Sequence, residues 1–338
     1  MKNSLERRDF LKYLGGFTAG MMAPATSWSF GNKDKWGKVL PKRQLGSTGI
    51  EVTMLGLGGY HIGWTTEKDA AETIAAAMEG GIRFYDSAES YGPHTSEIRY
   101  GKYLVPKYRD EVFIMTKSQA KDAKTAQQHL DGSLQRMGCD YLDLWQIHSL
   151  RTPEDVEERL NNGVLDVFLK AKADGKVKHI GFTGHSDPAA HAHMLKMTKE
   201  DQPFDTCQMP VNVVDAAYEH SFIETVMPTL IERKIGALAM KTLADGRFFP
   251  EKVMNGKTSW ETSDPVVPDR VSIAEALNFS WSLPVSVLIT GAENAEMLKE
   301  KIDMAKKFED MNEESRMALI AKVRDLAAGK QVEYYKQV

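Results

Sequence analysis

The chain has 338 residues, of which 42% are hydrophobic and 27% are charged, an ordinary composition for a globular protein with a large core. Its formal net charge of -4 argues against a basic surface for nucleic acid or an anionic membrane. The two cysteines, Cys139 and Cys207, match no metal-binding spacing, so we predict no metal ion and expect both to pack in the interior. A small molecule remains the expected partner.

The first 25 residues are predicted to be a targeting segment. Arg7 and Arg8 precede a modest apolar stretch over residues 13–22, and residues 23–25 (Ala-Pro-Ala) form a small-residue cleavage site. The string RRDFLK resembles the twin-arginine (Tat) signal, which implies export by the Tat translocase and a periplasmic location. Because no segment approaches about 18 uninterrupted apolar residues, we expect no stable membrane span in the mature protein.

After a predicted linker over residues 26–42, the remaining chain, residues 43–338, is predicted to form one domain. From Leu45 onward, short apolar runs of strand length alternate with stretches that have helical spacing of apolar residues. The eight runs cover residues 54–59, 82–88, 112–117, 141–148, 179–185, 207–213, 235–242 and 285–292. This alternation predicts an α/β fold, a closed (β/α)8 TIM barrel. A doubly wound open sheet is the alternative, but no GxGxxG turn follows a strand.

Local signals place the helices and three further segments. Thr66 is predicted to cap a helix that ends at Gly80, and Gly138 to end another. Leu165, Phe168, Leu169 and Lys172 are predicted to form the inward face of a helix that Gly175 ends. Residues 43–52 are predicted to form a hairpin that closes the N-terminal end of the barrel, residues 244–270 a long functional or mobile connection, and residues 312–329 an extra C-terminal helix.

Three consecutive predicted strands end in ionisable residues. The second ends at Asp86, with Tyr91 in the following loop, the third at Lys117 and the fourth at His148. Because reacting groups lie at the C-terminal rim of such barrels, and an unpaired buried charge costs several kcal/mol, we expect these four side chains to meet. Tyr91 would deliver a proton to a carbonyl oxygen, Lys117 would lower the pKa of the phenol, Asp86 would hold the lysine, and neutral His148 would orient the substrate.

The segments that carry these residues resemble the aldo-keto reductase family. They are GIRFYDSAESYG (residues 81–92), VFIMTKS around Lys117 and YLDLWQIH ending at His148, and the resemblance covers residues 45–310. It implies NAD(P)H-dependent interconversion of an alcohol and an aldehyde or ketone, sugar-derived carbonyls included, with Asp86, Tyr91, Lys117 and His148 as the catalytic residues.

The resemblance also assigns a binding site for NADP(H) or NAD(H), which we expect to be tightly bound. Its nicotinamide end would use Gly59, Thr183, Gly184, Gln208 and Met240, with Lys241 and Leu243 at the pyrophosphate. Its adenosine end would use Gly291, Ala292, Glu293, Met297 and Glu300. Glu293 stands where the family has a cation for the 2′-phosphate of NADP, which favours NAD.

Candidate substrate-contacting residues are His61, Trp64, His185 and Trp260. Two other functions remain open: a non-catalytic nicotinamide-binding sensor or regulatory subunit of the same fold, and a glycoside hydrolase. The hydrolase would need two carboxylates roughly 5–10 Å apart at the rim, where only Asp86 clearly ends a strand.

Overall fold

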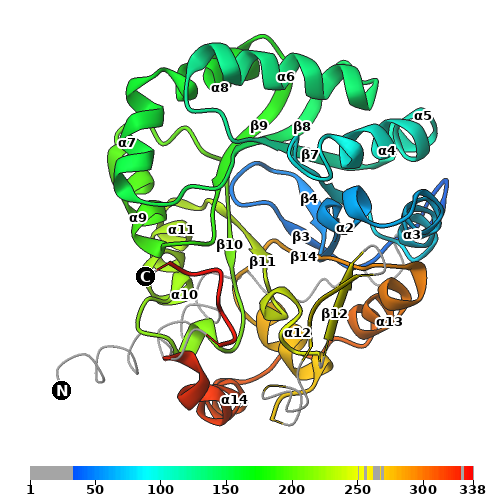
Figure 1. The fold of residues 1–338 in the computed structure, drawn as a ribbon, viewed down its shortest axis with the longest axis vertical. Coiled ribbons are helices and arrows are strands. Elements are labelled where there is room, and N and C mark those ends of the chain that lie inside the picture. The colour runs from blue at the N-terminus through cyan, green and yellow to red at the C-terminus, as the bar shows by residue number, and fades with distance from the viewer. Residues whose placement is uncertain are drawn as a thin grey trace.

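The computed structural model describes residues 33–249, 251–254, 257–261, 267, 270–328 and 331–337, and only the backbone of residues 253–254 and 257–261. The predicted targeting segment therefore lies outside the described residues. Parallel strands close into a barrel in the order β10-β11-β14-β5-β6-β7-β8-β9, which confirms the predicted TIM barrel (Figure 1). The barrel strands are β5 (Leu55–Gly58), β6 (Phe84–Asp86), β7 (Phe113–Ser118), β8 (Leu142–Ile147), β9 (Val177–Thr183), β10 (Thr206–Pro210), β11 (Gly236–Met240) and β14 (Val287–Thr290).

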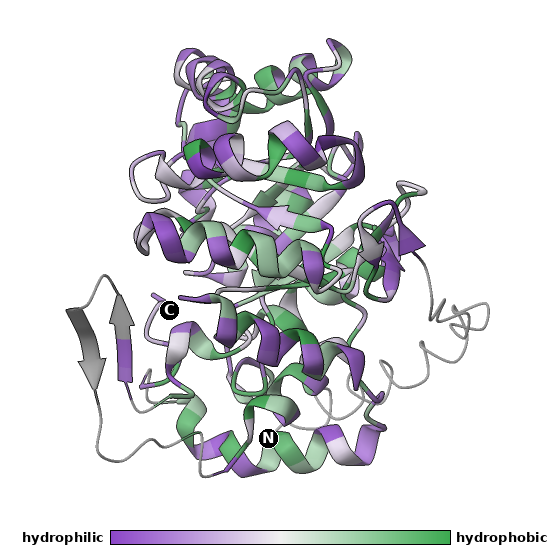
Figure 2. Ribbon diagram, turned by 90° about the vertical axis from the view of Figure 1, so that its right-hand side faces the viewer, coloured by the Kyte–Doolittle hydropathy of each residue, from purple (hydrophilic) through white to green (hydrophobic). Residues whose placement is uncertain are grey.

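Helices cover the outside of the barrel and turn hydrophilic residues outward and hydrophobic residues inward (Figure 2). They are α2 (Gly59–Trp64), α3 (Glu67–Glu79), α4 (Thr95–Tyr103), α5 (Val105–Tyr108), α6 (Ala123–Met137), α7 (Pro153–Asn161), α8 (Val164–Ala173), α9 (Pro188–Met197), α10 (Phe222–Thr225), α11 (Met227–Arg233), α12 (Ile273–Trp281), α13 (Ala295–Lys306) and α14 (Glu313–Ala327). The Thr66 side chain accepts a hydrogen bond from the Asp69 backbone N–H as the predicted cap of α3. Gly138, with φ of 62°, ends α6 as predicted.

The predicted inward face of α8 is wrong at one position. Leu169 is 41% exposed, whereas Val164, Phe168 and Ala171 are buried. These three residues follow the helical repeat of the face that packs on the barrel, and Leu169 lies one residue, about 100°, away from it. Apolar residues on both sides of Phe168 left the local pattern ambiguous.

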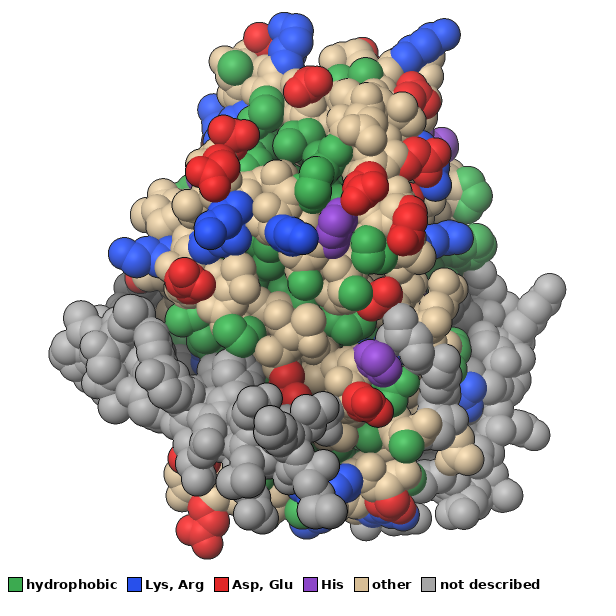
Figure 3. Space-filling model, turned by 90° about the vertical axis from the view of Figure 1, so that its left-hand side faces the viewer, with side chains coloured by type: hydrophobic (Ala, Val, Ile, Leu, Met, Phe, Trp, Pro, Cys, Tyr) green, Lys and Arg blue, Asp and Glu red, His purple; other side chains and the backbone are tan. Residues whose placement is uncertain are grey.

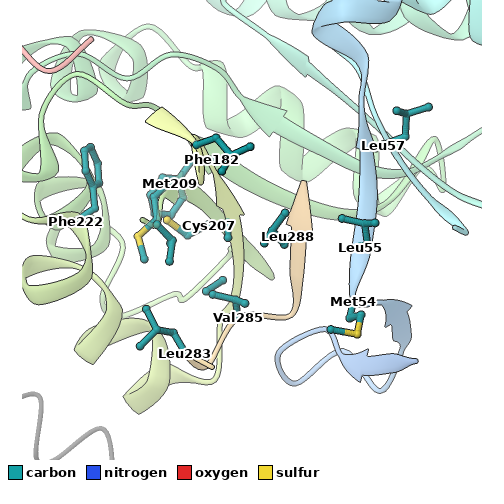
Figure 4. Packing of buried hydrophobic residues seen from close by; sticks show 14 of the residues in the cluster. Met54, Leu55, Leu57, Phe182, Cys207, Met209, Phe222, Leu283, Val285 and Leu288 are labelled. Carbon is teal, nitrogen blue, oxygen red and sulfur yellow. The ribbon is translucent and has the colours of Figure 1, made fainter. Parts of the chain in front are cut away.

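Two hydrophobic clusters hold the barrel together. The outer cluster lies between strands and helices and includes Leu57, Cys207 and Leu288 (Figure 4). The inner cluster fills the barrel with Leu45, Val52, Phe84, Met115, Leu144, Leu238, Val287 and Ile289. Its first two members come from the hairpin of β3 (Lys42–Gln44) and β4 (Glu51–Thr53), which closes the barrel as predicted.

Residues 33–42 are folded, so the predicted linker does not extend over them. Strands β1 (Lys33–Asp34) and β2 (Gly37–Lys38) form a small antiparallel hairpin. Asp34 accepts two hydrogen bonds from the Arg83 guanidinium, at 2.5 and 3.0 Å, and the Trp36 ring lies 4.7 Å from that of Tyr108. These partners lie far away in sequence, and no apolar periodicity marks the hairpin.

The predicted long connection after β11 begins with a turn, η3 (Ala244–Gly246), and continues as an antiparallel hairpin of β12 (Glu251–Met254) and β13 (Lys257–Glu261). After α14 the chain returns across the barrel rim as residues 331–337, the red segment near the C-terminus in Figure 1. We call residues 241–249 the strap and residues 331–337 the tail.

Charged side chains of both signs are interspersed on the face shown in Figure 3. Within the described ranges, no helix is long and apolar enough to cross a membrane. The same ranges contain no group of three or more His, Cys, Asp or Glu side chains placed to hold a metal ion. Cys139 and Cys207 are unpaired; Cys207 is buried and Cys139 is only half-buried.

Candidate active site

The alternation of side chains along three strands brings the predicted catalytic residues together. In β6, β7 and β8, residues of the inner cluster are followed two positions later by Asp86, Lys117 and Gln146. Because residues i and i+2 of a strand face the same side, these side chains form the next layer of the barrel interior. His148 follows Gln146 by two positions, at the C-terminal rim.

A buried ion pair joins the first two catalytic candidates. Lys117 Nζ pairs with Asp86 Oδ1, and the two residues are only 1% and 3% exposed. The same ammonium donates to the Ser87 carbonyl oxygen at 2.7 Å and to the Tyr91 hydroxyl oxygen at 3.2 Å. Burial raises the pKa of Asp86 and lowers the pKa of Lys117, and the charge of each partner opposes that shift.

Tyr91 is held in a tight turn beside Lys117. The next residue, Gly92, has φ of 60°, and a Cβ atom there would lie 2.0 Å from the Gly63 carbonyl oxygen, so only glycine fits. Burial raises the pKa of the Tyr91 phenol well above its ordinary value, and the charge of Asp86 adds to this shift. The shift is therefore opposite to the predicted lowering of this pKa, because burial dominates. The phenol stays protonated at neutral pH, the form that can donate a proton.

His148 lies against the tyrosine as a neutral imidazole. The two ring centroids are 5.7 Å apart, at an interplanar angle of 81°. Burial, followed by the positive charge of Lys117, lowers the pKa of His148 well below its ordinary value. Its Nδ1 atom is buried without a hydrogen-bond partner among the described residues. A neutral imidazole beside a phenol can direct a polar substrate oxygen toward that phenol.

A cavity of about 760 Å³ opens at the C-terminal rim and contains most of the predicted site. The predicted residues that line it are Asp86, Tyr91, His148, His61, Trp64, His185, Thr183, Gly184, Gln208, Met240, Lys241, Leu243, Gly291, Ala292, Glu293 and Met297. Lys117 does not line the cavity, and reaches it through its hydrogen bond to Tyr91.

Three predicted contacts do not join this lining. Gly59 faces the protein interior, where a Cβ atom would lie 2.2 Å from the Asp86 carbonyl oxygen, so this glycine lets α2 start close to β6. Glu300 is exposed on α13, because the helix turns it away from the cavity that Met297 lines. The side chain of Trp260 lies outside the described residues, and its backbone pairs with Lys252 in the β12–β13 hairpin.

Gln208 and Thr183 offer hydrogen-bonding groups for a carboxamide at the end of the cavity predicted for the nicotinamide. Gln208 pairs in register with Thr183 across β9 and β10, and both line the cavity. The Gln208 Oε1 atom is buried and has no hydrogen-bond partner among the described residues. At Gly184, a Cβ atom would lie 2.4 Å from the Leu150 carbonyl oxygen. This close approach leaves no room for a side chain at position 184.

The end of the cavity predicted for the adenosine contains a cation that sequence analysis missed. Lys301 lines the cavity with Glu293, and its ammonium donates to the Gly291 carbonyl oxygen at 2.5 Å. Burial lowers the pKa of Lys301 to about 8 and raises the pKa of Glu293. Lys301 follows Met297 by one helical turn, and this spacing was the available signal.

The strap forms one wall of the cavity in a strained conformation. Lys241, Ala244 and Asp245 have φ of 55°, 47° and 59°, values that residues other than glycine seldom adopt. Asp245 pairs with Lys241 at 2.7 Å and with Lys252 at 3.0 Å. Other lining residues outside the sequence-based set are Tyr60, Ser90, Gln119, Ser149, Phe249 and Glu251. Apart from Glu251, which begins β12, they lie in loops or at a helix end, without a periodic pattern.

The chain is similar in sequence to known proteins. Residues 54–323 match the sequence profile described as the Aldo/keto reductase family. The chain is 31% identical over 220 residues to the Aldo-keto reductase YhdN of Bacillus subtilis (strain 168), covering 60% of this chain and 62% of that protein. The match thus spans less than two thirds of the relative's length. A longer match, 24% identical over 301 residues, covers 80% of this chain and 89% of the L-galactose dehydrogenase of Arabidopsis thaliana.

Solved structures share the fold. The holo form of the aldo-keto reductase AKR11C1 from Bacillus halodurans superposes with a TM-score of 0.70. The superposition covers 87% of this chain and 99% of that one at 19% sequence identity. Its apo form gives a TM-score of 0.65. At this level of identity, the likeness shows the barrel architecture alone.

Proposed function

Because this chain belongs to the aldo/keto reductase family, we propose that it interconverts a carbonyl group and an alcohol with a nicotinamide dinucleotide. The observation that carries the proposal is the protonated Tyr91 phenol, 3.2 Å from the Lys117 ammonium, at the edge of the cavity. The unpartnered Gln208 Oε1 atom in the same cavity suits the nicotinamide carboxamide.

Each of the four side chains has its own role in carbonyl reduction. Neutral His148 donates a hydrogen bond to the substrate oxygen and orients it, and the Tyr91 hydroxyl delivers its proton to that oxygen. Lys117 stabilises the phenolate that remains, while Asp86 keeps the lysine charged and in position. When bound, the dinucleotide supplies the hydride that reaches the carbonyl carbon. In alcohol oxidation Tyr91 acts as the base instead.

A turnover assay tests this proposal. Purified protein is mixed with NADH or NADPH and a panel of aldehydes, ketones and sugars, and cofactor absorbance is followed; sugars are included because one relative is named as a sugar dehydrogenase. We expect consumption of cofactor with at least one carbonyl compound. Binding of the dinucleotide without turnover, in either reaction direction, would support the sensor or regulatory-subunit alternative.

The preferred cofactor is proposed to be NAD(H). Glu293 lines the adenosine end as an acid, where it would repel a 2′-phosphate and accept a hydrogen bond from a ribose hydroxyl. The nearby Lys301 partly offsets this repulsion, so we expect a moderate preference rather than exclusion of NADP(H).

The export signal suggests where the reaction takes place. We propose that the Tat route carries the folded protein to the periplasm with its cofactor already bound, on the basis of Arg7-Arg8 and the cleavage-site pattern. Retention there requires tight binding, and a nanomolar Kd corresponds to about -12 kcal/mol. Turnover would then need a second substrate that returns the bound dinucleotide to its starting oxidation state.

Purification without added cofactor tests this retention. Absorbance and mass spectra under native and denaturing conditions should reveal about one dinucleotide per chain, which stays bound through native purification and is freed by denaturation. A protein that emerges empty and binds nicotinamide dinucleotide only at micromolar concentrations or weaker would contradict retention, while leaving the proposed reaction intact.

A further inference from the structure

The tail lies beside the candidate site, and no sequence motif indicated that position. Beyond α14, residues 331–337 cross the C-terminal face of the barrel toward α9 and α11 (Figure 1). The Gln337 backbone N–H donates to the Ser186 carbonyl oxygen at 2.8 Å. Ser186 follows His185, a candidate substrate-contacting residue that lines the cavity. The tail thus ends next to the cavity that contains the proposed site.

Buried charges anchor the tail. Lys336 Nζ contacts Asp215 Oδ1 and Glu333 Oε2, each at 2.6 Å, and the side chains of Lys336 and Asp215 are fully buried. The Lys336 ammonium also lies 4.7 Å from the Tyr218 ring centroid. Because breaking a buried ion pair leaves an uncompensated charge, this network holds residues 333–336 firmly against the barrel.

The anchored tail contacts both the cavity-lining residue His185 and the strap. The Tyr335 ring meets the His185 ring edge-on, with centroids 5.6 Å apart. The Tyr335 hydroxyl donates to Glu333 at 2.6 Å, and the Asn212 amide reaches both this Glu333 carboxylate, at 2.9 Å, and the Lys241 carbonyl oxygen, at 3.1 Å. Asn212 therefore links the tail to the first residue of the strap.

Tyr334 makes the direct bond between tail and strap. Its hydroxyl donates to Asp245, the carboxylate that also pairs with Lys241 and Lys252, and its ring lies 4.9 Å from the Arg247 guanidinium carbon. Burial tends to raise the pKa of Asp245, but the charges of Lys241 and Lys252 and the hydrogen bond from Tyr334 lower it overall. The donor therefore meets an ionised acceptor, which makes the bond charge-assisted.

We propose that Tyr334 is a positioning residue that fastens the strap against the cofactor cavity and slows the release of bound nicotinamide dinucleotide. The inference rests on the proposed function. Backbone strain supports it independently, since Asp245 has φ of 59° and strained residues persist only where their surroundings over-determine them. Asp245 lies between two lysines of the cavity wall, so loosening it frees both side chains and the strap that carries them.

The test replaces the hydroxyl alone. Tyr334→Phe keeps the ring beside Arg247, and because Tyr334 is 43% exposed the variant should fold. Wild type and variant are loaded with NADH in one experiment and with NADPH in another. Each complex is mixed with an excess of competing dinucleotide, and the fluorescence of the bound cofactor gives its rate of release. Tyr103→Phe is the matched control, since it removes another tyrosine–carboxylate hydrogen bond, to Glu67 at 2.6 Å, away from the cavity.

We expect Tyr334→Phe to release the dinucleotide about threefold to tenfold faster. This range is smaller than for a fully buried charge-assisted hydrogen bond, because solvent screens the bond at a partly exposed site. KM for the dinucleotide should rise while kcat does not fall, and trypsin should cleave the cofactor-free variant faster after Arg247. Release and cleavage within twofold of the Tyr103→Phe control would overturn the role of Tyr334 and leave the proposed reaction standing. If wild type binds neither dinucleotide, both the inference and the proposed function are wrong.

Discussion

The two sides of the cavity are built on different principles. On the catalytic side, Asp86 and Lys117 lie on barrel strands and are 3% and 1% exposed. The two-residue repeat of β6 and β7 orients their side chains toward the barrel interior. On the cofactor side, the strap has three non-glycine residues with positive φ, and the side chains of Lys241 and Asp245 are 22% and 20% exposed. The first side is positioned by regular backbone, and the second by contacts between side chains distant in sequence.

This difference has a functional consequence. Proton delivery requires a phenol fixed within a few tenths of an ångström, and the strand-borne Lys117 together with the tight turn at Gly92 holds Tyr91 in place. Binding and release of a large dinucleotide require a wall that can yield, and segments of irregular backbone open more readily than strands. Substitutions on the catalytic side should therefore affect rate or folding strongly, while those on the cofactor side should shift affinities by smaller factors.

The largest effect is expected at the catalytic side. Tyr91→Phe removes the proposed acid and should lower kcat by roughly 10²–10⁴, while Kd for the dinucleotide changes little because the ring remains. Steady-state kinetics with the best carbonyl substrate, together with fluorescence titration of cofactor, measures both quantities. A variant that keeps more than half of the activity would remove Tyr91 from the mechanism.

A second change on the same side should affect folding. Lys117→Met leaves Asp86 buried without its ammonium partner, which should reduce the free energy of unfolding by about 3–5 kcal/mol. Urea denaturation followed by circular dichroism measures this loss. The double variant Lys117→Met/Asp86→Asn should recover part of it, because the uncompensated charge is gone; no recovery would mean that the loss comes from packing.

On the cofactor side, a charge reversal should produce a moderate shift. Glu293→Arg places a guanidinium where a 2′-phosphate would lie, and should move the ratio of Kd values toward NADP(H) by about tenfold, or about 1.4 kcal/mol. Titration calorimetry with both dinucleotides gives the ratio. Glu296→Arg makes the same charge change at an exposed position of α13 and serves as the control. An equal shift in both variants would indicate a general electrostatic effect.

The smallest expected effect is a pH dependence of cofactor binding. Burial lowers the pKa of Lys301 to about 8, so its ammonium is largely present at pH 7 and is lost as the pH rises to 9. Because the cation attracts an anionic dinucleotide, Kd should rise by about threefold over this interval. Lys301→Met should bind more weakly at pH 7 and show a flat profile. An unchanged slope in that variant would assign the titration to another group.

Much of the architecture could be predicted locally. Buried parallel strands are apolar on both faces, so all eight barrel strands were recognised within a few residues of their observed ends. The convergence of Asp86, Lys117 and His148 also followed from sequence, because each stands at the end of its strand and parallel strands share one C-terminal rim. Caps such as Thr66 and Gly138 were recognised for the same reason, since they satisfy or end backbone hydrogen bonding nearby.

Other features depended on partners brought close only by the tertiary structure. Asp34 accepts a hydrogen bond from Arg83, 49 positions away, and Asp245 accepts one from Tyr334, 89 positions away. No periodic pattern in the sequence indicates either pair. The pKa of Tyr91 also escaped local reasoning, because burial and the charge of Asp86 together outweigh the neighbouring lysine.

The sequence by itself therefore determined the barrel and the set of candidate catalytic side chains, since both follow from short-range periodicity and backbone geometry. Only the tertiary structure decided how the cavity is closed. The strap and the tail meet through charges and aromatic rings whose partners lie in other parts of the chain, such as Lys336 with Asp215 and Tyr335 with His185. Such contacts depend on the packing of the whole barrel, and local propensity carries no information about them.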